Sequence, residues 1–451
     1  MVNDNVHSFW QSKFGAYQAN APLARDLDVD VVIIGGGFTG LTVAREILRD
    51  SPGASVCVLE AGVVGSGASG RNGGFSMTLF GVEPEITVLR WGMERTKQAQ
   101  AFMQSAVRYV RDLVETEGLQ SDYVHSGMWR VAYSDRQLRR LRKTMALLSD
   151  LSGPSSFSFL EADELRQHIH SPRIQGAIVE PETGILDPCK HVRELKRLAQ
   201  ARGAQIYENT PVLSISQRTG GITAHCSSGN VRATRMVVAT NAWSHCLNGL
   251  PKIRSRQRPA WTYQIVTEPL TEEEWAMIGW RGLQSIEDNR QLVHYLRVTS
   301  CGRITVGGGD VVTSYGTNMA RDSSEEIWKK LHAHLGWLFP ALKDKPVHYR
   351  WGGPVSVNLD MTPEIGFIGD ERIIYATGCQ GHGVSLTQLN GRLIADLLAD
   401  RSTELTDFWI VNRKAVPMPG EPLAYLGQRL VTGILRGIDR WEERQLDQAK
   451  A

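Results

Sequence analysis

The chain has 451 residues, of which 42% are hydrophobic and 22% charged, and its formal net charge is +2. This balance excludes a disordered chain, and the length predicts two to three domains. The near-neutral charge gives no reason to expect a nucleic acid or an acidic membrane as the partner. The six cysteines form no Cys-x-x-Cys pair, so we expect reduced thiols and no metal site.

The start of the chain lacks the basic residues and the apolar stretch of a secretory signal. No apolar run approaches the roughly 20 residues that cross a bilayer. We therefore expect a cytoplasmic protein.

Residues 28–60 predict a strand–turn–helix–strand (βαβ) unit. Residues 29–34 are nearly all apolar, as in a strand buried on both faces. Apolar residues then recur at helical spacing from Leu41 to Leu48, and a second apolar run covers residues 56–59.

The turn between the first strand and the helix has the spacing Gly35-x-Gly37-x-x-Gly40. Such glycines allow a tight turn, close approach of a pyrophosphate and close packing of helix on strand. Glu60, at the end of the second strand, can accept hydrogen bonds from both hydroxyls of a ribose. The alternative is a purely structural turn beside a surface glutamate, but the complete unit favours a dinucleotide site.

A second glycine-rich loop, Gly67 to Gly74, follows with the sequence GASGRNGG. Its glycines let the backbone lie against a flat or phosphorylated ligand, and Ser69, Arg71 and Asn72 offer donors. As a bare pattern it could also be a flexible surface loop.

The middle of the chain predicts helices and further strands. Residues 84–149 are helical and charged apart from a strand at 127–132, and residues 190–239 predict a helix followed by strands. Strands are expected at 261–266, 292–298 and 303–307, a helix at 325–338, and a last strand, glycine turn and helix over 373–398.

The fold class expected is α/β, with a Rossmann-like dinucleotide-binding domain interleaved with an antiparallel-sheet substrate domain. Residues 1–85, 170–245 and 352–400 are assigned to the first domain and residues 86–169 and 246–351 to the second. Residues 401–451 form a C-terminal tail with an amphipathic helix. We expect this helix to pack on its own chain or on a second subunit rather than on a membrane.

The GASGRNGG loop after the βαβ unit resembles the FAD-dependent D-amino-acid oxidase superfamily, especially γ-glutamylputrescine-oxidase-like amine oxidoreductases. Residues 8–10, 237–243, 350–353, 362–366 and 381–383 resemble further landmarks of that family. The resemblance implies that residues 71–74 lie beside the flavin ring and that residues 378–384 face its pyrimidine edge.

Together, the motifs and the resemblance predict which residues hold the cofactor. The start of the last helix offers N–H donors to the negative charge of reduced flavin. The predicted FAD contacts are Gly35, Gly37, Phe38, Thr39, Gly40, Glu60, Ala61, Ser69, Arg71, Asn72, Gly73, Gly74, Val212, Thr240, Gly353, Gly378, Gly381, His382, Gly383 and Val384.

Relatives that link FAD covalently through histidine carry that histidine at the position that matches Arg71, so non-covalent FAD is expected. Relatives that reduce oxygen readily carry a lysine where this chain has Thr305. The electron acceptor is therefore left open between oxygen and another carrier, including a protein partner.

For the substrate, we expect an aromatic-lined pocket and a residue that pairs with an anionic group. The alternative for each aromatic residue is an ordinary core position. The candidates for binding are Trp261, Tyr263, Tyr295, Arg297 and Trp351, and those for catalysis are His382, Arg71 and Tyr263.

The predicted reaction is oxidation of the C–N bond of an amine or amino acid, by hydride transfer to flavin N5, to an imine that hydrolyses to a carbonyl. The alternatives are a flavin dehydrogenase of a hydroxy acid or polyol, and a non-catalytic FAD-binding redox subunit. A homo-oligomer is compatible with the sequence.

Overall fold

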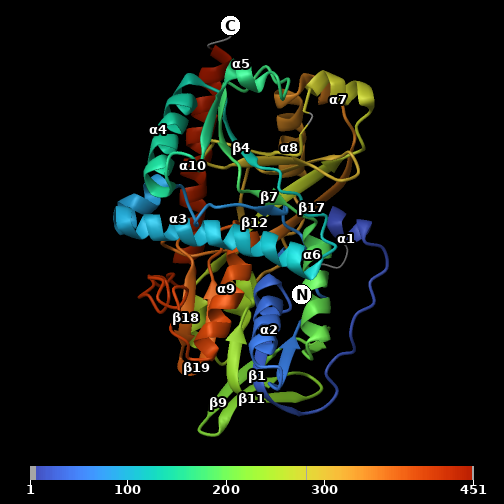
Figure 1. Cartoon of the computed structure of the whole chain (residues 1–451), viewed down its shortest axis with the longest axis vertical. Coiled ribbons are helices and arrows are strands. Elements are labelled where there is room, and N and C mark those ends of the chain that lie inside the picture. Colours follow the sequence, from blue (N-terminus) through green and yellow to red (C-terminus); the bar gives the residue numbers. More distant parts are fainter. Residues whose placement is uncertain (1–6, 281, 449–451) are drawn as a thin grey trace.

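Figure 1 shows the computed structural model of the chain, which describes residues 7–280 and 282–448. One sheet, with helices α2 (Phe38–Asp50), α6 (Pro188–Ala201) and α9 (Gly383–Leu398), forms one half of the molecule. A second sheet forms the other half, and the long helix α3 (Pro84–Glu117) runs across the middle.

The first sheet has eight strands, and the order β18-β19-β11-β1-β2-β8 is extended by β10 and β9. All pairings among β19, β11, β1, β2 and β8 are parallel, whereas β18 is antiparallel to β19. The bounds are β1 Leu27–Ile34, β2 Val56–Leu59, β8 Gln205–Tyr207, β9 Ser214–Arg218, β10 Gly221–His225, β11 Asn230–Val238, β18 Glu364–Ile368 and β19 Asp370–Thr377.

The core of this half explains why its strands are nearly all apolar. Ile33 and Val237 are fully buried under the helix layer, while Val32 and Val238 are fully buried on the opposite face. A strand covered on both faces needs apolar residues at consecutive positions, as the sequence of β1 shows.

The second sheet has nine strands in the order β16-β12-β15-β14-β13-β4-β6-β5, with β17 paired to β12. Only β13 and β4 are parallel. The bounds are β4 Met128–Ala132, β5 Ser158–Glu161, β6 Gly176–Glu180, β12 Arg258–Thr267, β13 Ser285–Asp288, β14 His294–Val298, β15 Ile304–Gly308, β16 Val312–Thr313 and β17 Val347–Val357.

The two faces of the nine-stranded sheet pack against different parts of the molecule. Ile265, Leu296 and Val306 are fully buried in a core that includes Leu331 and Leu335 of helix α8 (Glu325–Leu338). Side chains at the alternate positions of the same strands point to the opposite face, toward the GASGRNGG loop. This second face is the one that can meet a ligand held by the eight-stranded sheet.

The chain crosses between the sheets several times, which agrees with an α/β fold of interleaved parts. Two borders differ from those expected from the sequence. Strand β6 and the end of β17 (352–357) belong to the nine-stranded sheet, although residues 170–245 and 352–400 were assigned to the first domain. Apolar patterning identifies a strand but not the sheet it joins.

The remaining elements are short or peripheral. β3 (Phe75–Ser76), which directly follows the GASGRNGG loop, pairs with β7 (Gly184–Ile185) in a two-stranded sheet. The other elements are α1 Phe9–Lys13, α4 Asp135–Ser152, α5 Ala162–Leu165, α7 Glu272–Ile278, α10 Leu423–Gln448 and the 3-10 helices Ala68–Gly70, Asn241–Cys246, Pro251–Ser255 and Pro340–Leu342.

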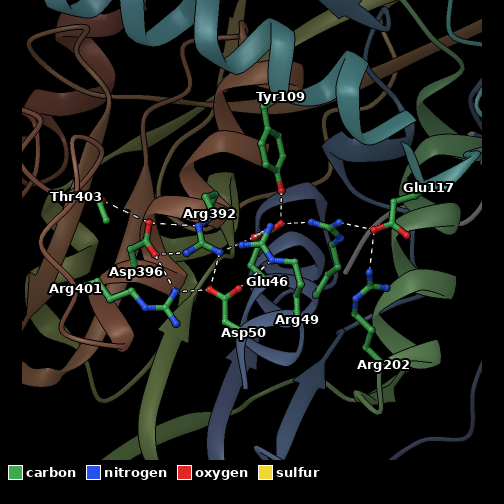
Figure 2. A network of polar contacts seen from close by, with 11 residues as sticks. Glu46, Arg49, Asp50, Tyr109, Glu117, Arg202, Arg392, Asp396, Arg401 and Thr403 are labelled. Atoms are coloured by element: carbon green, nitrogen blue, oxygen red, sulfur yellow. Dashed lines mark hydrogen bonds and ion pairs between the residues drawn. The ribbon is translucent and has the colours of Figure 1, made fainter. Parts of the chain in front are cut away.

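A polar network joins α2 and α9 of the first half to the long helix α3 (Figure 2). At its centre the fully buried Glu46 of α2 accepts a hydrogen bond of 2.6 Å from Tyr109 of α3. The same carboxylate forms ion pairs with Arg45 and with Arg392 of α9. The network therefore fixes α2, α3 and α9 relative to one another.

Helix α10 packs on the body of its own chain. The Asp439 carboxylate accepts hydrogen bonds of 2.9 Å from the backbone N–H groups of Gln291 and Leu292. On its outward face Leu430 is 66% exposed and Ile434 54%. Within the described residues, none of the helices combines the length and the hydropathy that a membrane span requires.

Candidate functional site

The first glycine turn has the geometry expected of a pyrophosphate cradle. β1 ends at Ile34, Gly35 follows with a φ of 108°, and α2 begins at Phe38. A Cβ on Gly40 would lie 2.0 Å from the carbonyl oxygen of Gly35, so only glycine fits there. Gly37, which precedes α2, has no side chain to cap the helix, and Ser69 pairs with the first N–H group. The helix dipole and the remaining N–H groups of the first turn thus stay available to an anion.

The GASGRNGG loop lies directly against this turn. Ser69 Oγ accepts a hydrogen bond of 3.0 Å from the backbone N–H of Phe38, and a Cβ on Gly37 would lie 2.9 Å from the same oxygen. The Phe38 side chain is buried against the ring of His191, so only its backbone faces the turn. Gly37 and Thr39 remain partly exposed.

Glu60 is held at the end of β2 by backbone donors. Its carboxylate accepts hydrogen bonds of 2.8 Å from Gly36 and 2.9 Å from Gly62. Burial raises the pKa of this carboxyl above its ordinary value. Each oxygen still has a lone pair for a ribose hydroxyl, and Ala61 beside it is exposed.

The GASGRNGG loop is also hydrogen-bonded to the nine-stranded sheet. The Arg71 guanidinium donates two hydrogen bonds, of 3.0 and 2.8 Å, to the carbonyl oxygen of Gly352. The Arg71 carbonyl in turn accepts from Gln264 and from Trp351, at 2.9 and 2.8 Å. Asn72 Oδ1 accepts from the N–H of Gly74 at 2.7 Å. These bonds fix the backbone that would lie along a flat ligand.

Arg71, Arg297 and Trp351 are therefore engaged in the fold, contrary to their expected catalytic or substrate-binding roles. Arg297 Nη1 donates to the carbonyl oxygens of Gly73 and Leu186, at 3.1 and 2.7 Å, and burial lowers its pKa to about 10. Trp351 is fully buried. A guanidinium occupied in this way positions the loop rather than pairing with a substrate anion.

Trp261 and Tyr263 require a second correction. They lie on the face of β12 that packs in the core with α8, and they are 0% and 1% exposed. Trp261 Nε1 donates to Asp322 at 3.1 Å, and the Tyr263 hydroxyl donates to the Arg321 carbonyl at 2.7 Å. Neither side chain can reach a substrate on the other face of the sheet, so Tyr263 has no catalytic role there.

The third glycine turn joins β19 to α9. Gly378 and Gly381 have φ values of 74° and 89°, and Gln380 also adopts a left-handed conformation, with a φ of 54°. His382 precedes α9 without a side-chain cap, so the helix begins with free N–H groups. Burial, followed by the charge of Arg130, lowers the pKa of His382 to about 4, so the imidazole is neutral near pH 7.

Unpaired polar atoms gather around this turn. Asn358 Oδ1, Thr377 Oγ1, His382 Nδ1 and both side-chain polar atoms of Gln380 are buried without hydrogen-bond partners in the described part of the chain. Such atoms are costly unless a ligand or water pairs with them. The turn thus has the polar groups that a flavin ring requires.

The remaining predicted FAD contacts lie in β17, after β11, before β9 and at the start of α9. Gly353 is partly exposed, and a Cβ there would lie 3.6 Å from the Arg71 side chain. The Thr240 hydroxyl bonds to Ser244 at 2.8 Å. Val212 packs beside the core on the β9–β10 side. Gly383 is partly exposed and Val384 is buried at the start of α9.

The structure adds two residues that the sequence did not single out, Glu287 of β13 and Arg130 of β4. They pair in the sheet register, and Glu287 also pairs with Tyr295 of β14. The Tyr295 ring is partly exposed and packs edge-on against Phe75, at 5.3 Å between centroids. The available signal was Arg130, a charged residue in the otherwise apolar strand Met128–Ala132.

A glycine turn at a helix start, an acid at the next strand end and a third turn with unpaired polar atoms are the features of a dinucleotide-binding flavoprotein. The chain belongs to the FAD dependent oxidoreductase family, which matches residues 30–397. It is therefore an enzyme with FAD as its cofactor, and the non-covalent attachment stays a prediction.

Known proteins agree with this assignment. The chain is 29% identical to γ-glutamylputrescine oxidoreductase of Escherichia coli (strain K12), over 93% of this chain and 94% of that protein. It is 25% identical to glycine oxidase of Bacillus licheniformis, over 86% of this chain and 96% of the relative. The fold matches L-proline dehydrogenase from P. horikoshii with a TM-score of 0.72, at 21% identity, over 86% of this chain and 97% of that one.

Proposed function

We propose that the enzyme oxidises the C–N bond of a small amine or amino acid to an imine, which water hydrolyses to a carbonyl compound. The observation that carries this proposal is the charge on one face of the nine-stranded sheet. This face, here called the inner face, is opposite the core with α8 and is turned toward the GASGRNGG loop. Arg71 and Arg297 are bound to backbone carbonyls, whereas Glu287 keeps an oxygen without a hydrogen bond from the described residues. This arrangement favours a cationic substrate over a hydroxy acid or a phosphate ester.

The names of two relatives support a nitrogen-bearing substrate, since they specify γ-glutamylputrescine and glycine. When bound, FAD supplies the acceptor for a hydride from the carbon next to the nitrogen. The Gly35–Gly40 turn holds the pyrophosphate, and Glu60 binds the ribose. The free N–H groups at the start of α9 stabilise negative charge on the cofactor, and the nine-stranded sheet excludes water.

The test is anaerobic bleaching of the purified yellow protein by a panel of amines and amino acids, matched with hydroxy acids and polyols of equal size. We expect bleaching by amines. Bleaching by hydroxy acids alone would indicate the alternative dehydrogenase, and a flavin that no small molecule reduces would indicate a redox subunit.

A further inference from the structure

Glu287 lies where the two halves of the molecule meet. It alternates with the fully buried Ile286, so its side chain is on the face opposite the α8 core. The ring of its register partner Tyr295 lies against the GASGRNGG loop, since a Cβ on Gly73 would be 3.1 Å from that ring. Glu287 is thus paired in the sheet with a residue that contacts the GASGRNGG loop.

The pairing of Glu287 is incomplete. Its Oε2 atom is buried and accepts no hydrogen bond from the described residues, and the Arg130 Nε atom is 3.7 Å away. Arg130 gives its shorter contact, 2.9 Å from Nη1, to Glu83. By contrast, the equally buried Glu180 accepts hydrogen bonds from both the N–H and the hydroxyl of Thr78.

The surrounding charge is negative. Besides Arg130, the charged groups that act on Glu287 are the carboxylates Glu83, Asp288 and Glu180. Asp288 is already bonded to His294, at 3.0 Å. Asp288 also forms an ion pair with Arg290, at 3.4 Å. Arg130 is therefore the guanidinium that faces the other three carboxylates. This balance leaves room for a second cation with hydrogen-bond donors, and a substrate ammonium supplies both.

The charge of Arg130 also acts on the glycine turn between β19 and α9, here called the cofactor turn. Arg130 helps to keep His382, at the start of α9, in its neutral form. Glu287 is thus the register neighbour of a residue whose charge acts at the cofactor turn.

We propose that Glu287 binds the ammonium nitrogen of the substrate and accepts its proton, so that the amine reacts in its neutral form. This inference rests on the proposed function. The step converts R–NH3⁺ and a carboxylate into R–NH2 and a carboxylic acid, and no electrons move until the C–N bond is oxidised. Burial raises the pKa of Glu287 to about 8, so the carboxylate form that accepts this proton becomes the major one only as the pH rises through about 8.

The first test compares anaerobic flavin bleaching by a saturating amine in wild type and in Glu287→Gln. We expect the variant to retain FAD but to bleach about 100-fold more slowly, as for the loss of a general base. Its rate should recover at higher pH, where the amine is already neutral. The control is Asp310→Asn, which removes a buried carboxylate at the contact with Arg436 of α10 and should bleach at the wild-type rate.

Two further measurements distinguish loss of the carboxylate from a general structural defect of the variant. Glu287→Ala should regain bleaching when formate is added, since the small acid replaces the missing carboxylate. Independently of activity, the melting temperature of Glu287→Gln relative to wild type should rise from pH 5 to pH 9. A carboxyl with a raised pKa contributes stability at low pH and loses it as the pH rises through about 8.

Wild-type bleaching rates and an unchanged pH profile in Glu287→Gln would overturn the assignment while leaving the proposed function intact. A wild-type protein that holds FAD but is bleached by no amine would overturn the proposed function, and the role of Glu287 with it.

Discussion

Gly40 shows how one missing side chain permits cofactor binding. In Gly40→Ala the new Cβ would lie 2.0 Å from the carbonyl oxygen of Gly35, so the turn must move. We expect loss of most bound FAD and a destabilisation of about 1–3 kcal/mol or more, measured by the flavin absorbance of the purified protein and by thermal unfolding. Gly53→Ala is the control, because a Cβ there meets no atom within 4 Å. Normal flavin content in Gly40→Ala would contradict the assigned turn.

Glu60 supports a second prediction at this scale. Glu60→Gln keeps the size of the side chain but turns one acceptor into a donor that faces a backbone N–H group. Since hydrogen bonds to charged groups contribute about 1.5–3 kcal/mol, the affinity of the apoprotein for FAD should fall at least tenfold. Fluorescence titration measures it, with the exposed Glu371→Gln as control. Equal affinity in both variants would remove Glu60 from the site.

Among the elements, helix α10 offers the simplest test of what holds a peripheral segment in place. Asp439→Ala leaves the N–H groups of Gln291 and Leu292 without their acceptor. We expect a loss of about 2–4 kcal/mol and faster proteolysis of the C-terminal helix, while FAD stays bound. Replacing the exposed Gln445 with alanine should change neither property. Resistance to protease equal to wild type would show that other contacts fix the helix.

Elements with strong periodicity were predicted well. The helix expected at 325–338 is α8, and the strands expected near 261–266 and 303–307 are β12 and β15. The faces of those strands were not predicted. Trp261 and Tyr263 share one face of β12 because they are two residues apart, but alternation does not say which face meets α8.

For the whole molecule, the network around Glu46 is the main polar link between helices that are distant in sequence (Figure 2). Glu46→Gln leaves Arg45 and Arg392 beside a neutral group in a buried place. We expect a destabilisation of about 3 kcal/mol in urea unfolding monitored by circular dichroism. Arg49→Gln, at a side chain that is 41% exposed, should cost much less. Equal losses in both variants would show that burial of Glu46 is not what matters.

The sequence by itself determined the βαβ unit and the glycine turns, because backbone conformations that need glycine and strands buried on both faces leave local traces. Its resemblance to a known family indicated FAD as the cofactor. Only the tertiary structure decided which polar side chains are free. Arg71 and Arg297 look like anion-binding residues until Gly352 and Leu186 are seen to use their donors. Glu287 becomes a candidate only when Arg130 is seen to pair with Glu83, since pairing depends on residues far apart in the chain.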